Sequence, residues 1–207
     1  MSKENPEFID EKIIELLNKE QRKRVMELEK NNILTGIKTG MININGEDIE
    51  FHEKTLLDGK INIILPKSFS EMSPEIASIK YPSERRPKLI YTNESTSINI
   101  SFNHTSTEVL DKNMYRFKDA MLQIVKKMQP AATWLEDGVE QINGRNIVYF
   151  DFLTDAIDGK IYNFTFIAEL EGRALICSFN CTEEEMKQWK QVARGIMETL
   201  KVNTSIA

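Results

Sequence analysis

The side chains best suited to chemistry in this sequence are its two histidines, and neither has the neighbours that a site needs. His52 and His104 each stand at the end of a predicted strand, without another His or Cys at ligand spacing. Because a metal site needs three or four convergent ligands, we interpret both as surface or strand-end packing residues. The hydroxyls of Ser101 and Thr105 near His104 lack the strained elbow that activates a nucleophile. The sequence therefore predicts no metal site and no catalytic residue.

The two cysteines are the next candidates. Cys177 and Cys181 are four residues apart in a predicted strand, so they share a face but stand roughly 13 Å apart at about 3.3 Å per residue. They cannot form a disulfide with each other, since that requires Cα atoms within about 7 Å. With Leu175 and Phe179 on the same face, we interpret them as reduced, buried core residues, and we expect no cofactor.

The strongest local concentration of positive charge lies between residues 80 and 88. Its candidate contact residues are Lys80, Tyr81, Arg85, Arg86 and Lys88. One interpretation is a solvated loop, which is the usual state of a surface charge run. The other is a contact with an acidic or phosphorylated partner, because Arg binds carboxylates and phosphates with two parallel hydrogen bonds and Tyr is enriched at interfaces.

A polar face of the predicted sheet is a second candidate surface. Its hydroxyl, amide and carboxylate side chains are Ser97, Asn99, Ser101, Tyr149, Asp151, Asn163 and Thr165. They form one patch if their strands are neighbours with the same orientation. Ordinary solvent exposure explains the pattern, since half-buried antiparallel sheets alternate in this way. The alternative is a pocket for a small molecule.

Glycines mark where the chain reverses between the strands that carry these residues. Six of the nine glycines directly follow Asn, Asp or Glu, at 45–46, 58–59, 137–138, 143–144, 158–159 and 171–172. Tight hairpin turns need positive φ, which Gly adopts freely and which Asn and Asp tolerate. We therefore expect antiparallel strands within residues 41–51, 60–65, 89–92, 96–103, 133–142, 146–154, 160–170 and 173–181.

Three segments have helical spacing. Residues 9–28 carry a thin apolar stripe interrupted by the polar run 19–24, and Asn31, Asn32, Gly36 and Gly40 predict the end of this helix. Residues 111–129 form a second helix, which Pro130 prevents from continuing. In the third helix, Thr182 and Glu185 have the spacing of a capping box, followed by an apolar stripe.

These elements predict a chain in two parts. Residues 1–35 form an N-terminal amphipathic helix and a linker, and residues 41–203 form one compact domain. We expect an α+β fold, in which a twisted antiparallel sheet of about six to seven strands has helices packed on it.

The charge of the chain excludes some classes of function. The net charge of −5 and the isoelectric point of about 5.3 give no positive field for nucleic acid. Residues 1–10 contain no apolar run like that of a secretory signal, and no later stretch approaches the ~20 apolar residues of a membrane span. We expect a cytoplasmic protein without membrane insertion.

Five stretches of residues 60–202 resemble the PsbP-like and DcrB-like superfamily. They are INIILPKSF at 61–69, KYPSERRP at 80–87, SINISFNHT at 97–105, IYNFT at 161–165 and SFNCTEEEMKQWKQVA at 178–193. The resemblance implies an α/β/α sandwich. Characterised relatives act mainly by binding other proteins: one group serves photosystem II, and another binds the small GTPase Ran. Many bacterial relatives are exported or lipid-anchored, and this sequence lacks the signal for that.

We therefore expect a non-enzymatic protein-binding or adaptor module with an unidentified protein partner. Two alternatives stay open. The chain could be a small-molecule-binding protein or an enzyme that uses a pocket on the polar sheet face. It could also be a self-associating structural protein that forms a homodimer through the helix of residues 9–28.

Overall fold

The computed structural model describes residues 6–84 and 86–203, with side chains from residue 17 onward. Its elements in chain order are α1 (Pro6–Thr39), β1 (Met41–Ile44), β2 (Glu47–Leu56), β3 (Ile61–Pro66), β4 (Ser70–Glu71), α2 (Pro74–Lys80), β5 (Leu89–Thr92), β6 (Asn99–Glu108), the 3₁₀ turn η1 (Asp111–Asn113), α3 (Met114–Met128), β7 (Thr133–Ile142), β8 (Arg145–Ala156), β9 (Gly159–Leu170), β10 (Arg173–Thr182), α4 (Glu183–Glu198) and β11 (Lys201–Val202).

The strands form two sheets. The larger has seven strands in the order β4-β5-β6-β10-β9-β8-β7, and the smaller has four in the order β1-β2-β3-β11. Every pair of neighbouring strands is antiparallel. The expected α+β fold with an antiparallel sheet of six to seven strands is therefore confirmed.

Most of the predicted reversals are tight turns. Asn45 and Gly46 between β1 and β2 have φ of 53° and 86°, and Asn143 and Gly144 between β7 and β8 have φ of 48° and 80°. Gly138 is different, because it lies inside β7 opposite Tyr149. A Cβ at this glycine would stand 2.5 Å from the Tyr149 hydroxyl. The pair at 137–138 therefore marks no reversal, the expected strand over residues 133–142 is confirmed, and the glycine makes room for a ring on the neighbouring strand.

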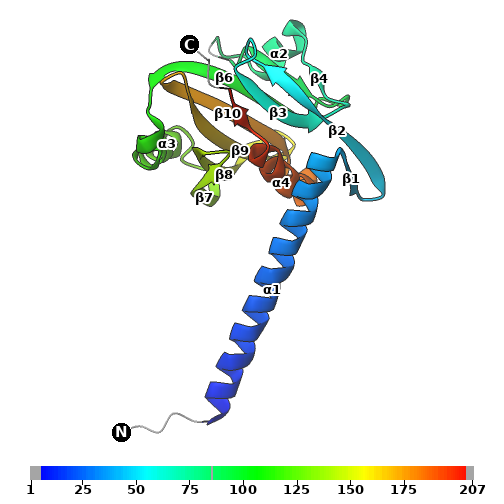
Figure 1. Cartoon of the computed structure of the whole chain (residues 1–207), viewed down its shortest axis with the longest axis vertical. Helices are drawn as coiled ribbons and strands as arrows, with labels where there is room; N and C mark the ends of the chain where they lie inside the picture. The colour runs from blue at the N-terminus through cyan, green and yellow to red at the C-terminus, as the bar shows by residue number, and fades with distance from the viewer. Residues whose placement is uncertain (1–5, 85, 204–207) are drawn as a thin grey trace.

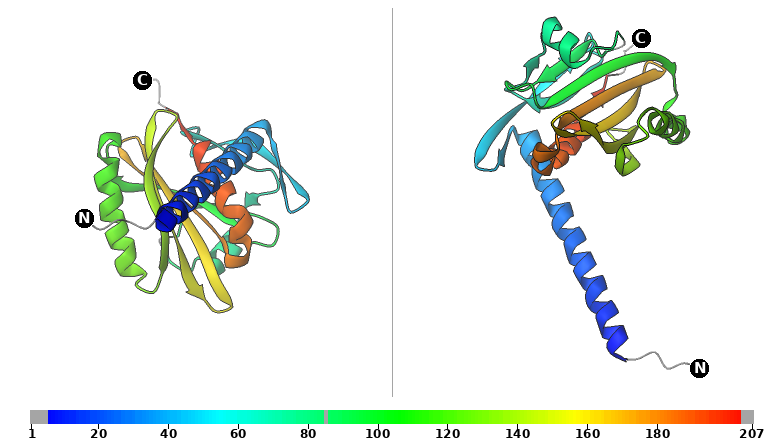
Figure 2. Two further views of the ribbon diagram at one scale, coloured as in Figure 1. Left: turned by 90° about the horizontal axis from the view of Figure 1, so that it is seen from below. Right: turned by 180° about the vertical axis from the view of Figure 1, so that it is seen from behind.

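Helices cover both faces of the large sheet (Figure 2). On one face, α4 and the small sheet enclose a core that includes Phe164, Phe179 and Ile196. On the other face, α3 packs Met114 and Leu122 against β8 and β9. The capping box at the start of α4 is present as predicted, with Thr182 and Glu185 each bonding to the other's backbone N–H.

The inner end of α1 belongs to the core. The helix continues through Asn31, Asn32 and Gly36 to Thr39, so of the expected end signals only Gly40, at φ 100°, ends it, and the expected linker is helical. The reason is close packing: Gly36 lies under Ile42 of β1, and a Cβ on Gly195 of α4 would stand 2.6 Å from Cδ1 of Ile37. Glycine at both positions lets the backbones approach.

The outer part of α1 extends away from the rest of the molecule (Figure 1). The helix has 34 residues, which corresponds to about 51 Å at 1.5 Å per residue. Its described outer side chains are exposed, including the apolar Leu17, Val25 and Leu28. The predicted stripe residues 9–16 lie outside the described side chains. None of the described helices combines the length and the apolar character needed to cross a bilayer.

Candidate functional site

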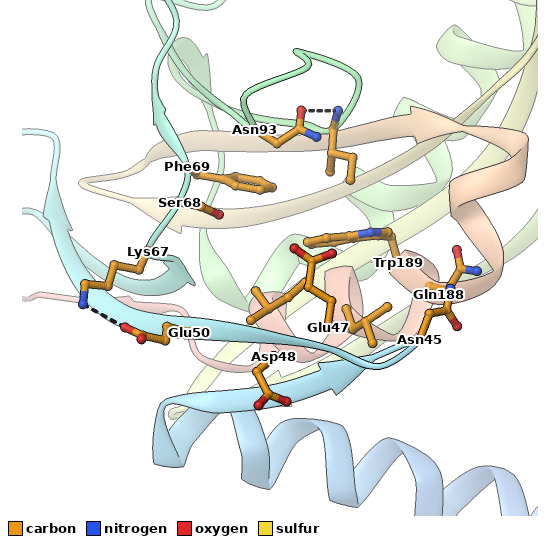
Figure 3. A pocket seen from close by; sticks show the side chains of 13 residues that line it. Asn45, Glu47, Asp48, Glu50, Lys67, Ser68, Phe69, Asn93, Gln188 and Trp189 are labelled. Atoms are coloured by element: carbon orange, nitrogen blue, oxygen red, sulfur yellow. Dashed lines mark hydrogen bonds and ion pairs between the residues drawn. The ribbon is translucent and has the colours of Figure 1, made fainter.

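A groove between the β1–β2 hairpin and α4 is the best-defined candidate site (Figure 3). The tight turn at Asn45 and Gly46 pairs Ile44 with Glu47, and Ile49 lies two residues further along β2. Because directly opposite residues share a face, Ile44, Glu47 and Ile49 all lie on the inner face of the hairpin. One carboxylate therefore stands on an otherwise apolar wall.

Two aromatic rings line the groove opposite the hairpin. Phe69 is the third residue after β3 and lies in the connection to β4. Trp189 lies in the second turn of α4. Their rings stack with centroids 5.8 Å apart, and Trp189 also stacks on Phe179 at 6.2 Å. Both rings are held in place by the core beneath them, so the groove has a rigid apolar surface.

The loop of residues 93–98 closes the far side. The Asn93 side chain accepts a bond from the Ile98 N–H at 3.0 Å and donates to Ser95 at 2.9 Å. Ser97 donates to the Glu185 carboxylate at 2.5 Å, which ties the loop to the first turn of α4. These bonds hold the wall in one conformation without any ligand.

The charges around the groove are unbalanced. At one end Lys67 and Glu50 pair at 2.8 Å, and this hydrogen bond and charge lower the pKa of Glu50. Glu47 points toward Trp189, whereas Asp48 lies on the outer face of the hairpin (Figure 3). Within the described part of the chain, neither Glu47 nor Asp48 forms an ion pair. The groove, of about 640 Å³, can therefore hold an apolar side chain next to a cation.

The predicted polar sheet face is only partly correct. Ser101 and Thr165 lie on one face with Ser178 between them, and Asn99 and Asn163 lie on the same face with Asn180 between them. Tyr149 and Asp151 pair with Phe166 and Phe164 and so lie on the opposite face. The sequence could have predicted this opposite orientation. A tight turn at residues 156–159 pairs residue 151 with residue 164, so residue 151 cannot share a face with residue 163 or 165.

The shared polar face is largely satisfied internally. Asn99 accepts a bond from Thr92 at 2.7 Å and donates to Asn180 at 3.0 Å. Asn180 also donates to the Tyr81 hydroxyl at 3.1 Å. Ser97 precedes β6 and belongs to the loop over the groove. These groups bond to one another and do not converge on a ligand.

The segment at residues 80–88 is only partly available to a partner. Lys80 donates to the Thr96 carbonyl, and burial is the main cause that lowers its pKa. Tyr81 is half-buried, and burial raises its pKa, so it is not the exposed ring that we expected. Arg86 and Lys88 are exposed, and Arg85 lies outside the described residues. A role of Arg86 and Lys88 in partner binding stays a prediction.

The cysteines and histidines behave as packing residues. Cys177 and Cys181 are buried and free, and burial raises the pKa of the Cys181 thiol to about 12. His104 Nε2 lies 2.9 Å from the Leu170 carbonyl oxygen. His52 Nδ1 is buried without a hydrogen-bond partner, and burial lowers the pKa of this imidazole. Among the described residues, no three His, Cys, Asp or Glu side chains are grouped to hold a metal.

An ionic network around the buried Asp151 lies between β8 and α4, and the sequence did not suggest it. Asp151 is fully buried and accepts bonds from the Glu136 N–H at 2.7 Å and the Tyr162 hydroxyl at 2.9 Å. The Lys190 ammonium lies 2.9 Å from the same carboxylate. Arg194 binds Glu136 at 2.7 Å. Because each group has a partner inside the fold, we interpret the network as structural.

This network predicts a loss of stability at alkaline pH. Burial, and then the neighbouring Asp151, raise the pKa of Tyr162 above its ordinary value. The unfolded chain ionises Tyr162 near pH 10 while the folded chain keeps the proton, so stability is full below about pH 10 and falls above it by about 1.4 kcal/mol per pH unit. Urea unfolding between pH 8 and 11 should show this fall reduced in Tyr162→Phe. Tyr115 is exposed, so Tyr115→Phe should leave the fall in stability unchanged. If the free energy of unfolding falls equally with pH in both variants, Tyr162 is not its cause.

Comparison with known proteins shows the fold. No protein-family model matches the chain, and no curated protein matches it in sequence. The solution structure of cyanobacterial PsbP (CyanoP) from Synechocystis sp. PCC 6803 is similar with a TM-score of 0.54 and 8% identity, over 74% of this chain and 92% of that one. PA94 of Pseudomonas aeruginosa, a protein of unknown function, has a TM-score of 0.44 and 13% identity, over 80% and 97%. The similarity to CyanoP confirms the expected PsbP-like fold.

Proposed function

We propose that this chain is a protein-binding module that acts without catalysis, and that the groove beneath the β1–β2 hairpin is its binding surface. The partner is a basic peptide segment that carries a large apolar side chain. The observation that carries this proposal is Glu47, a carboxylate without an ion-pair partner among the described residues, directed toward the stacked rings of Phe69 and Trp189.

The apolar surface supplies the attraction for such a partner. Aromatic side chains held by a packed core act as anchors at protein interfaces, because they lose little conformational freedom when they are covered. Trp189 and Phe69 are only 8% and 3% exposed and form a rigid floor, since Phe69 and Phe179 stack on Trp189, while the half-buried Ile44 and Ile49 offer apolar surface that a partner can cover. An apolar side chain entering the groove would therefore meet a preformed surface.

The charges supply the selectivity. Near its tip the hairpin carries Glu47, Asp48 and Glu50, and among the described residues only Glu50 of these three has a cation beside it, Lys67. The whole chain is also acidic, with a net charge of −5. A basic segment gains attraction at this surface, whereas an acidic one is repelled, and such complementarity selects partners more than it raises affinity. The resemblance to PsbP-like proteins, whose characterised members bind other proteins, supports a binding role.

Fluorescence anisotropy with labelled synthetic peptides tests the proposal. The peptides would combine Lys-rich or Glu-rich flanks with a central Leu or a central Ser. We expect saturable binding of the Lys-rich Leu peptide alone, weakened about tenfold or more by Glu47→Lys, because attraction becomes repulsion. Asp158→Lys makes the same charge change on the exposed β8–β9 turn and should leave binding unchanged. If both variants bind the peptide equally, or if the parent chain does not bind it, the groove is not the binding site.

A further inference from the structure

The outward face of α3 carries a polar row that points away from the domain. Four exposed residues of this helix recur at steps of three or four positions: Arg116, Ala120, Gln123 and Lys127. At about 100° per residue they fall within an arc of about 60°. Met114 and Val125 lie on the other side of the helix and pack against the large sheet. We call the exposed row the α3 stripe.

The charges on and beside the α3 stripe are mainly positive, although the chain as a whole is acidic. α3 carries four basic residues and one acidic residue, whereas the whole chain has 27 basic and 32 acidic residues. The acidic one, Asp119, lies beside the stripe with its carboxylate 3.4 Å from the Lys118 ammonium. Within the described part of the chain, Arg116 and Lys127 have no ion-pair partner, and neither has the exposed Lys112 one turn earlier in η1. Three unpaired cations are therefore spread over about 22 Å of surface at about 1.5 Å per residue.

Exposed apolar side chains border the α3 stripe on both sides. Ile124 and Met128 are 51% and 70% exposed along one border, and Tyr115 is 60% exposed along the other. At the surface of a bilayer, Lys and Arg reach the phosphate groups while Tyr and aliphatic side chains enter the interfacial layer. The α3 stripe and its borders have the side chains that such a surface needs.

The position of α3 leaves this face accessible to a flat surface. The helix lies along the outer margin of the molecule in both views of Figure 2. The β1–β2 hairpin lies at the opposite margin, and α1 projects from between the two (Figure 2). A flat surface can therefore meet α3 without meeting another helix first.

We infer that the α3 stripe is a docking surface for a lipid bilayer that contains anionic lipids. Its cations are complementary to the phosphates of such a bilayer, and each cation near the surface adds attraction. A single convex helix offers no groove for a peptide segment, which favours a bilayer over an acidic protein.

The acidic groove does not oppose this contact. It lies with α4 on the face of the large sheet opposite to α3. Because salt screens charges beyond about 8 Å, carboxylates on that far face repel the bilayer little. Docking through the α3 stripe therefore leaves the groove accessible, and it does not depend on the peptide-binding proposal.

Sedimentation of the full chain with lipid vesicles tests the inference. We expect binding to vesicles of phosphatidylglycerol and phosphatidylcholine, release by added salt, and no binding to phosphatidylcholine alone. Arg116→Glu combined with Lys127→Glu should weaken binding about thirtyfold or more, because two attractions become repulsions. Lys19→Glu combined with Arg22→Glu makes the same change of charge at exposed positions of α1 and should leave binding unchanged.

A replacement without a change of charge tests the apolar border. Met128→Ser should weaken binding to the anionic vesicles about threefold or more, because it removes an apolar group from the interfacial layer. Circular dichroism checks that every variant is folded. Failure of the parent chain to sediment with anionic vesicles, or equal losses in the two double variants, would overturn the inference. Retention on immobilised polyglutamate without vesicle binding would assign the α3 stripe to an acidic protein and would also overturn it.

Discussion

Replacing Asp151 with alanine should lower the free energy of unfolding by about 3–5 kcal/mol, the usual cost of removing one partner of a buried ion pair. The substitution leaves the Lys190 ammonium without its carboxylate, and it removes the acceptor of the Tyr162 hydroxyl and of the Glu136 N–H. Since Asp151 is fully buried, water is poorly placed to replace these bonds. Urea denaturation followed by circular dichroism measures the loss.

An exposed ion pair provides the control for this prediction. Glu171 accepts from Lys60 at 2.8 Å, but both side chains are substantially exposed. Glu171→Ala should therefore change the free energy of unfolding far less than Asp151→Ala does, because solvent screens an exposed ion pair. If Asp151→Ala costs as little as Glu171→Ala, then water enters behind β8 and the network contributes little to the fold.

Replacing Ile37 with alanine should lower the free energy of unfolding by about 2–5 kcal/mol, because it opens a cavity in a packed core. Ile37 has no exposed surface, although it lies in the last turn of a helix that otherwise extends into solvent. Its Cδ1 lies against Gly195 of α4. The same urea measurement applies.

Thr35, two residues earlier on the same helix, separates core packing from helix propensity. Its side chain is exposed, so Thr35→Ala should change stability by no more than about 0.5 kcal/mol. A small loss for Ile37→Ala would mean that the inner turns of α1 are not part of the core. It would also restore the boundary near residue 40 that the sequence predicted.

The candidate groove was partly readable from the sequence. The turn at Asn45 and Gly46 determines that Glu47 shares a face with Ile44 and Ile49. A single charge on an apolar face could therefore have indicated a binding site. The sequence could not predict that Phe69 and Trp189 stack beneath Glu47, because these two residues are 120 positions apart. Their contact depends on how the small sheet and α4 pack together.

The sequence by itself determined the elements whose signals lie within a few residues. Positive φ at residue pairs such as Asn143 and Gly144, and the reciprocal bonds of Thr182 and Glu185, are local properties of the backbone. The strand ends at these turns and the closing helix therefore agree with the prediction, whereas β2 and β6 each run five residues beyond their predicted ends at 51 and 103.

Only the tertiary structure decided which faces meet. Gly36 predicts a helix end from its own propensity, yet α1 continues through it because packing against Ile42 and α4 outweighs the local cost. Gly138 follows Asp137 like the turn glycines, yet it lies inside β7 beneath the Tyr149 ring. In both cases the deciding contact comes from a neighbouring strand or helix that a glycine allows to approach, and that contact forms only when the chain has folded.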